Sequence, residues 1–228
     1  MLEEKFRNAV DSDDSLGVAL ALQEGLDLTK SYEVLGNYCP LSYVVCHGYN
    51  AIDIFKMLVD SGADINFRDL NGSTVLFQAI ALNEMDIMEA LFDLGVDLNV
   101  CNTEGDNAFH WAASFFSPYT QTLIKRLVDG GVDINARNKS FETPLHRASK
   151  NIKDIVEVLV SSGADLDAVD HEGRTPLHVA CYRQREDIVE LLVSKGANTR
   201  TKDEWGRTPI QVAKMVENSR ILNMLEKK

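Results

Sequence analysis

Histidine and cysteine are the side chains of this sequence best suited to catalysis or metal binding, and their positions argue against both. Three of the five histidines, His110, His146 and His178, close the same short phrase, whose best copies read Thr-Pro-Leu-His. A catalytic site needs only one histidine, so three copies at one phase of a repeat indicate a shared architectural role. The other two, His47 and His171, lie in predicted turns without a serine or cysteine nucleophile at a meaningful spacing. We assign no catalytic residue.

The four cysteines form neither a CxxC pair nor a disulfide framework, and a reducing compartment fits them best. Cys39 and Cys46, next to His47, have the residue types of a zinc site, but their spacing is unfamiliar for zinc and no second pair follows. No Asp-x-Asp-x-Asp-Gly loop gathers the aspartates around a cation, and the usual phosphate-binding and hydrolase motifs are absent. We therefore expect no metal, no cofactor and no enzymatic activity.

With 228 residues, of which 45% are apolar and 25% charged, the chain has the composition of a folded soluble protein. Its apolar runs are far shorter than the roughly 18 residues of a membrane span, and its opening residues lack the pattern of a secretory signal. The formal net charge of -12 would repel a polyphosphate backbone. We expect an intracellular, cytoplasmic protein that binds neither membranes nor nucleic acid, with a nuclear location left open.

One phrase recurs along the chain, as Thr-Pro-Leu-His at residues 143–146 and 175–178 and as worn copies elsewhere, and a glycine-aspartate phrase recurs in step with it. In the first phrase threonine can cap a helix and proline suits its first position, whereas glycine can end a helix in the left-handed conformation. Each unit is predicted to be two short helices with an extended link, and units must stack to bury their apolar faces. The apolar anchors lie 35, 33, 36, 32 and 33 residues apart: Leu41, Leu76, Phe109, Leu145, Leu177 and Ile210.

The complete phrase Thr-Pro-Leu-His-x-Ala, at residues 143–148 and 175–180, resembles the signature of the ankyrin repeat, and the resemblance covers practically the whole chain. It implies an all-α fold, a solenoid of stacked helix-turn-helix units joined by β-hairpin fingers, in which the histidine of the phrase bonds backbone near the links. We expect a single domain over 1–228, made of an N-terminal cap at about 1–35, repeats at about 36–68, 69–101, 102–137, 138–170 and 171–203, and a C-terminal cap at about 204–228.

The resemblance also implies a modification. Asn66, Asn99 and Asn135 occupy the position at which ankyrin repeats in animals can be hydroxylated by an asparaginyl hydroxylase, and a leucine precedes each by eight residues. An asparagine that only bonds its own turn is the alternative. Hydroxylation of one or more of the three is therefore a hypothesis.

In ankyrin stacks the fingers and the exposed side of the first helices form a concave groove, so the resemblance places the binding site there. The positions that the repeat leaves free carry eight positive and five negative side chains, whereas acids concentrate in the second helices, which predicts a mildly basic groove and an acidic back. Trp205 and Tyr182 are of types enriched at binding hot spots, although packing of a finger on its neighbour would explain them equally well. The expected protein-binding residues are Arg68, Leu70, Leu82, Phe115, Arg137, Lys139, His171, Arg174, Tyr182, Arg183, Lys202, Trp205 and Arg207.

Two places depart from the repeat. The unit that starts at about residue 102 has three extra residues between its helices, and Phe115, Phe116 and Tyr119 fill this turn. We expect them to form an exposed patch, with burial under the neighbouring units as the alternative. Phe141 stands at a usual glycine position, where it would distort its finger or add a contact.

The function that follows is a non-enzymatic protein–protein interaction module, a scaffold or adaptor that holds an acidic or apolar segment of a partner in the groove. An inhibitor or host-directed effector that blocks a partner enzyme through the same surface is the alternative. The partner is expected to be another protein, whose identity the sequence does not give because one fold serves many functions. The chain is expected to be a monomer, with self-assembly through the aromatic turn as the alternative.

Overall fold

The regular structure of this protein is helical. A computed structural model describes residues 1–48, 51–115 and 117–226. Within these residues the only β-type pairing is an isolated antiparallel bridge between Tyr32 and Tyr38. The chain divides into two compact units, Met1–Thr103 and Glu104–Lys228, called here the N-terminal and the C-terminal unit and described separately.

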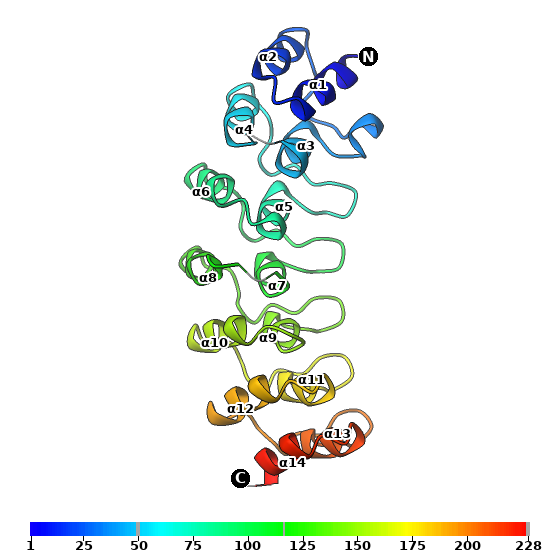
Figure 1. Ribbon diagram of the computed structural model, residues 1–228, viewed down its shortest axis with the longest axis vertical. Coiled ribbons are helices and arrows are strands. Elements are labelled where there is room, and N and C mark those ends of the chain that lie inside the picture. Colours follow the sequence, from blue (N-terminus) through cyan, green and yellow to red (C-terminus); the bar gives the residue numbers. More distant parts are fainter. Residues whose placement is uncertain (49–50, 116, 227–228) are drawn as a thin grey trace. The chain divides into compact units, whose positions relative to one another are not determined.

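The N-terminal unit consists of helix pairs with a short 3-10 helix between the first pair and the second (Figure 1). Within it the first helices of successive pairs pack on one another, and so do the second helices. Its elements are α1 (Leu2–Asp11), α2 (Ser15–Gln23), η1 (Glu33–Leu35), α3 (Pro40–His47), α4 (Ala51–Asp60), α5 (Val75–Leu82) and α6 (Met85–Asp93).

The C-terminal unit repeats the same pairing, and its helices form two columns in Figure 1. The first helices of its pairs pack in one column and the second helices in the other. The first helices are α7 (Ala108–Ala112), α9 (Pro144–Ala148), α11 (Pro176–Tyr182) and α13 (Pro209–Met215), and the second helices are α8 (Thr120–Asp129), α10 (Lys153–Ser161), α12 (Glu186–Ser194) and α14 (Ser219–Glu226).

The recurring phrases set the ends of these helices. Thr175 caps α11 by accepting a hydrogen bond from the backbone N–H of His178, and Pro176 occupies the first helical position, where no hydrogen bond is lost. After α12, Gly196 turns the chain with φ +97°, a conformation that costs glycine little because it has no Cβ atom. The pair α11–α12 therefore begins and ends where its sequence requires.

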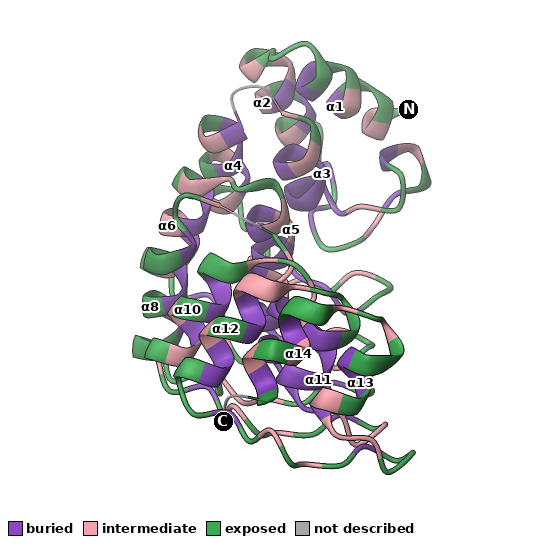
Figure 2. Ribbon diagram, turned by 60° about the horizontal axis from the view of Figure 1, so that its bottom comes forward, coloured by how far each residue is buried: buried purple, intermediate pink, exposed green. Residues whose placement is uncertain are grey.

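Five of the six apolar anchors lie in the cores of the two units, and Ile210 is only half-buried. Leu41 and Leu76 are buried in the N-terminal unit, and Phe109, Leu145 and Leu177 are fully buried in the C-terminal unit. Burial of one such side chain stabilises the fold by roughly 1.5–3 kcal/mol before the entropic cost of ordering it. In the C-terminal unit the buried positions lie on the facing sides of the helices and the exposed ones on their outer sides (Figure 2).

The links of the C-terminal unit end in tight turns, named here the first finger (138–142), the second finger (170–174) and the third finger (203–207). In the second finger the N–H of Asp170 donates to the carbonyl of Arg174, and the N–H of Gly173 donates back to the carbonyl of Asp170. A backbone bond from His171 to Ser140 joins the first and second fingers at 3.0 Å, and Glu204 bonds the second finger in the same way at 2.9 Å. No strand is assigned in these links, so the prediction of β-hairpin fingers is not confirmed.

Candidate protein-binding surface

Buried histidines fix the position of each finger against the helix before it. Nδ1 of His178 lies 3.1 Å from the backbone nitrogen of Thr175, and its Nε2 lies 3.0 Å from the carbonyl oxygen of Arg207 in the third finger. A backbone N–H can only donate, so Nδ1 accepts and Nε2 carries the proton that it donates to the carbonyl. His146 bonds the second finger in the same way, with Nε2 2.8 Å from the carbonyl oxygen of Arg174. Nε2 of His110 lies 2.9 Å from the carbonyl oxygen of Glu142 in the first finger, whereas its Nδ1 lies 2.7 Å from Oδ1 of Asn107.

At His146 and His178 this geometry requires a neutral imidazole. Burial lowers the pKa of His110, His146 and His178, and the bond to a finger carbonyl only partly opposes that effect. The predicted architectural role of these three histidines is thus confirmed, and each connects one repeat to the next.

An acid or amide at the first position of each finger holds the turn. Oδ1 of Asp203 accepts hydrogen bonds from the backbone N–H groups of Trp205 at 3.0 Å and Arg207 at 2.8 Å. Asp170 does the same in the second finger, and Asn138 does so in the first. The fingers are therefore rigid turns whose exposed side chains project from a fixed backbone.

The arginines at the fifth finger position are paired with these buried acids. Arg207 lies 2.7 Å from the carboxylate of Asp203, and Arg174 lies 2.7 Å from Asp170 and 2.6 Å from Glu172. Burial would raise the pKa of Asp203, but the hydrogen bonds and the charge of Arg207 outweigh it and hold that pKa below its usual value. Two arginines expected to attract a partner are thus neutralised within their own fingers.

The basic excess of this face is smaller than the sequence suggests. In the C-terminal unit, the positions that the repeat leaves free hold seven positive and five negative side chains: Arg137, Lys139, Lys150, Arg174, Arg183, Lys202 and Arg207 against Glu104, Asp106, Glu142, Glu172 and Glu204. This set omits Asp170 and Asp203, which pair with members of it, and Arg147, whose guanidinium binds Asp106 at 2.8 Å. Including them gives eight positive and seven negative side chains, a net charge of +1 instead of +2.

A hollow between the second and third fingers exposes two aromatic rings and a methionine. Trp205 is 57% exposed, and Tyr182 and Met215 are each 58% exposed, all three around a cavity of about 350 Å³ that Arg174 and Arg207 also line. The Arg207 guanidinium lies 4.3 Å from the centre of the Trp205 ring. Neither ring is buried by a neighbouring finger, which was the alternative to a binding role, and we name these residues the aromatic hollow.

The sequence matches a family model described as ankyrin repeats (three copies) in three places, over residues 41–138, 117–203 and 145–227. The chain belongs to the ankyrin-repeat family. A solved ankyrin-repeat domain, that of Bcl-3, a member of the IkappaB protein family, is similar over 97% of this chain and 97% of its own, with 27% identity and a TM-score of 0.79. No curated protein matches the sequence.

Ankyrin repeats are in general protein–protein interaction modules. The described part of the chain contains no helix with the length and apolar character of a membrane span.

The remaining expected binding residues of the ankyrin fingers and first helices are dispersed. Arg137, Lys139, His171, Arg183 and Lys202 are exposed in the C-terminal unit, where Arg183 lies 5.9 Å from the centre of the Tyr182 ring. In the N-terminal unit, Leu70 and Leu82 are exposed and Arg68 donates a hydrogen bond to the carbonyl of Cys101 at 2.5 Å. The aromatic hollow gathers several of the candidates around one cavity.

The aromatic turn of the third predicted repeat is partly exposed. Phe115 stacks on Trp111 with ring centres 5.9 Å apart and remains 40% exposed, and Tyr119 is also exposed. Phe116 lies outside the described residues. The two described rings agree with the exposed patch predicted for this turn.

Phe141 was not among the expected binding residues, although its place at a usual glycine position of the repeat marks it as unusual. It takes φ +58°, the left-handed conformation that Gly173 and Gly206 take at the same position in the second and third fingers. The first finger therefore keeps its turn, and the distortion considered above does not occur. The Arg137 guanidinium lies 4.6 Å from the ring centre instead.

Two of the three asparagines of the glycine phrases make contacts between repeats. Oδ1 of Asn66 accepts a hydrogen bond from the backbone N–H of Asp97, and Asn135 accepts one from Asp165, both at 2.8 Å. Asn99 is exposed. The leucines eight residues earlier are fully buried, so recognition of these leucines by a modifying enzyme would require local opening: Leu58, Leu91 and Leu127. Hydroxylation stays a prediction.

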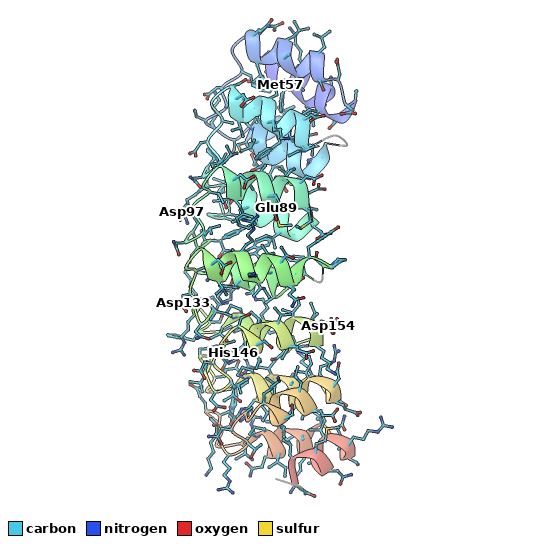
Figure 3. The ribbon with its side chains drawn as sticks, turned by 90° about the vertical axis from the view of Figure 1, so that its left-hand side faces the viewer. Met57, Glu89, Asp97, Asp133, His146 and Asp154 are labelled. Atoms are coloured by element: carbon cyan, nitrogen blue, oxygen red, sulfur yellow. The ribbon has the colours of Figure 1, made fainter. Side chains whose placement is uncertain are left out.

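The second helices of the C-terminal unit carry acidic side chains on their outer faces. The second helices face the viewer in Figure 3, where Asp154 is labelled on α10. Asp154, Glu157 and Glu190 are exposed there. No group of three or more potential metal ligands is found in the part of the chain that the structure describes.

Proposed function

We propose that this protein is a non-enzymatic scaffold or adaptor that binds a segment of a partner protein on the face formed by the fingers and first helices of the C-terminal unit. The observation that supports this proposal is the aromatic hollow, because Trp205, Tyr182 and Met215 leave large apolar areas uncovered around one cavity. Tryptophan and tyrosine are the side chains that most often contribute a large share of binding energy in protein interfaces.

The third finger supports the proposal because it holds the Trp205 ring in place before any partner arrives. Asp203 fixes the guanidinium of Arg207, and this group in turn lies over the Trp205 ring. A ring that is already ordered loses little conformational entropy on binding, so more of its contact energy appears as affinity.

The test compares a double variant, Trp205→Ala with Tyr182→Ala, with a matched control in which another exposed aromatic, Tyr119, is changed to alanine. A partner is captured from the source cells on the wild-type protein, identified, purified and titrated against each variant by calorimetry. Loss of one hot-spot ring costs about 2 kcal/mol or more, so the double variant should bind at least roughly 100-fold more weakly.

The control and the thermal melt decide the outcome. Tyr119→Ala should bind as wild type, and the double variant should melt near the wild-type temperature, because its rings are more than half exposed. A partner that binds the double variant with wild-type affinity would show that the hollow is not the binding site.

We also propose that the protein acts inside the cell as a monomer. Its four cysteines are free, including the exposed Cys101, which suits a reducing compartment. Light scattering across a concentration series and fluorescence imaging of the tagged protein test the two parts separately. A mass that rises with concentration would indicate self-assembly instead.

A further inference from the structure

The first finger contains a strained residue that the fold itself does not need. Phe141 has φ +58°, whereas glycine occupies this position in the second and third fingers. The left-handed conformation brings a Cβ atom too close to the neighbouring carbonyl oxygen, so it is unfavourable for every residue that carries a side chain. Glycine would form the same turn without that cost.

Burial does not compensate for the strain. Phe141 is 49% exposed, and the Arg137 guanidinium lies over its ring. A bulky residue held in a rare backbone conformation, with its side chain directed to solvent, points to a use outside the folded chain.

The cations beside Phe141 are not paired with a carboxylate in the part of the chain that the structure describes, unlike the arginines of the second and third fingers. Arg137 donates hydrogen bonds to the backbone carbonyls of Phe141 and Val169, and no ion pair to a carboxylate is recorded for Arg137 or Lys139 among the described residues. In contrast, Arg174 and Arg207 each pair with a buried aspartate. The first finger and Arg137, directly before it, therefore combine an exposed ring with two cations that no described carboxylate pairs.

We propose that this finger docks a segment of a partner protein that carries an aromatic or long aliphatic side chain next to carboxylates. The apolar side chain lies on the Phe141 ring, and the carboxylates pair with Arg137 and Lys139 (charge-assisted hydrogen bonds). The inference rests on the proposed function and names the chemistry of the partner.

The net charge of -12 does not prevent this binding. At physiological salt the screening length is about 8 Å, so cations in direct contact with the segment dominate over acids on the far side of the repeat. Two cations are too few to hold a polyphosphate chain against the same net charge, which favours a peptide over a nucleic acid.

The test starts from a library of random 12-residue peptides displayed on phage, selected on the immobilised full-length protein. Enriched peptides should carry net negative charge and at least one aromatic or long aliphatic residue. Their labelled synthetic forms are then titrated by fluorescence anisotropy against Phe141→Gly, Phe141→Ala and Lys139→Glu. Lys125→Glu is the matched charge control, because Lys125 is exposed on α8, outside the fingers.

We expect Phe141→Gly and Phe141→Ala to weaken binding at least tenfold, Lys139→Glu to weaken it severalfold and Lys125→Glu to leave it unchanged. Phe141→Gly should also raise the melting temperature by roughly 2–5 °C, because it relieves the strain, whereas Phe141→Ala should not raise it. Loss of affinity in a more stable protein cannot result from misfolding.

Several results would overturn the inference. These are a selection that yields no acidic peptide dependent on Phe141, a lower melting temperature for Phe141→Gly, or binding of a dT12 oligonucleotide that Lys139→Glu abolishes. Peptides that bind Phe141→Gly normally but fail on the Trp205→Ala, Tyr182→Ala double variant would refute this inference and leave the proposed function intact.

Discussion

Acidification from pH 7.5 to 5.5 should destabilise the C-terminal unit through its three buried histidines. His146 and His178 accept at Nδ1 from a backbone N–H and donate from Nε2 to a finger carbonyl, so the folded state holds these two imidazoles neutral, and His110 donates from Nε2 to the carbonyl of Glu142. Burial lowers the pKa of His110, His146 and His178, whereas in the unfolded chain they titrate near 6.5. The unfolded state therefore binds more protons as the pH falls through 6.5, and the free energy of unfolding decreases.

The size of the effect follows from proton linkage. A histidine that stays neutral in the folded state and titrates at about 6.5 when unfolded loses about 1.4 kcal/mol of stabilisation between pH 7.5 and 5.5. Three such sites give an upper limit of about 4 kcal/mol. The stabilisation is fully present above the unfolded pKa and is lost below it, and carboxylates, with unfolded pKa values of about 4, contribute little in this window.

Urea unfolding followed by tryptophan fluorescence measures this loss, because the two tryptophans of the chain, Trp111 and Trp205, both lie in the C-terminal unit. His178→Gln provides the matched variant. Gln211 already occupies the equivalent position after Thr208, where its Oε1 accepts the backbone N–H at 2.8 Å. Glutamine can accept and donate as the neutral imidazole does, but it does not titrate.

The variant should retain most of the stability at pH 7.5 and lose about a third less than wild type on acidification. A stability that stays flat from pH 7.5 to 5.5 would refute the reasoning. So would a pH dependence of His178→Gln identical to that of wild type, since the buried imidazole would then not be the titrating group.

Three further predictions test the fingers and the core. Gly173→Ala should lower the free energy of unfolding more than Gly206→Ala does, although both glycines have similar positive φ angles. A Cβ atom at Gly173 would lie 3.1 Å from a backbone nitrogen of the next finger, whereas one at Gly206 would meet nothing within 4 Å. Equal losses in urea unfolding would contradict this prediction. Asp203→Ala should lower the free energy of unfolding by about 3 kcal/mol and Asp203→Asn by less, since asparagine keeps the turn bonds and loses only the ion pair. With a thiol-reactive disulfide at pH 8, Cys101 should react in the native protein, whereas Cys181, whose pKa burial raises to about 12, should react only after urea unfolds it.

The helical part of the fold could be predicted from the sequence because its signals are local and repeated. Thr175, Pro176 and Gly196 act on their own helix ends, and the anchors Leu145 and Leu177 are buried as their period requires. The histidine contacts could not be derived this way, since each joins a ring to a carbonyl 28 to 32 residues later. The family resemblance supplied that contact, and the hydrogen-bond geometry then fixed the tautomer of His146 and His178.

The charge of the binding face was predicted less well, although the sequence contains a pattern that indicates the pairing of its arginines. Aspartate four residues before arginine recurs at Asp170 with Arg174 and at Asp203 with Arg207, and this spacing brings the two ends of a five-residue turn together. The count covered only positions that the repeat leaves free, so it left out Asp170 and Asp203. The left-handed Phe141 could be located from the missing glycine, but its exposure depends on the neighbouring finger.

The pairing of these arginines changes what they contribute to a binding face. A guanidinium held by a buried carboxylate gives little net attraction for an acidic partner, but it is fixed in space. Arg207, bonded to Asp203, lies over the Trp205 ring, and so the ion pair orients an aromatic side chain that is more than half exposed. Arg137 has no such carboxylate among the described residues and keeps its charge available beside Phe141. The same residue type therefore organises an apolar contact in the third finger and supplies charge in the first.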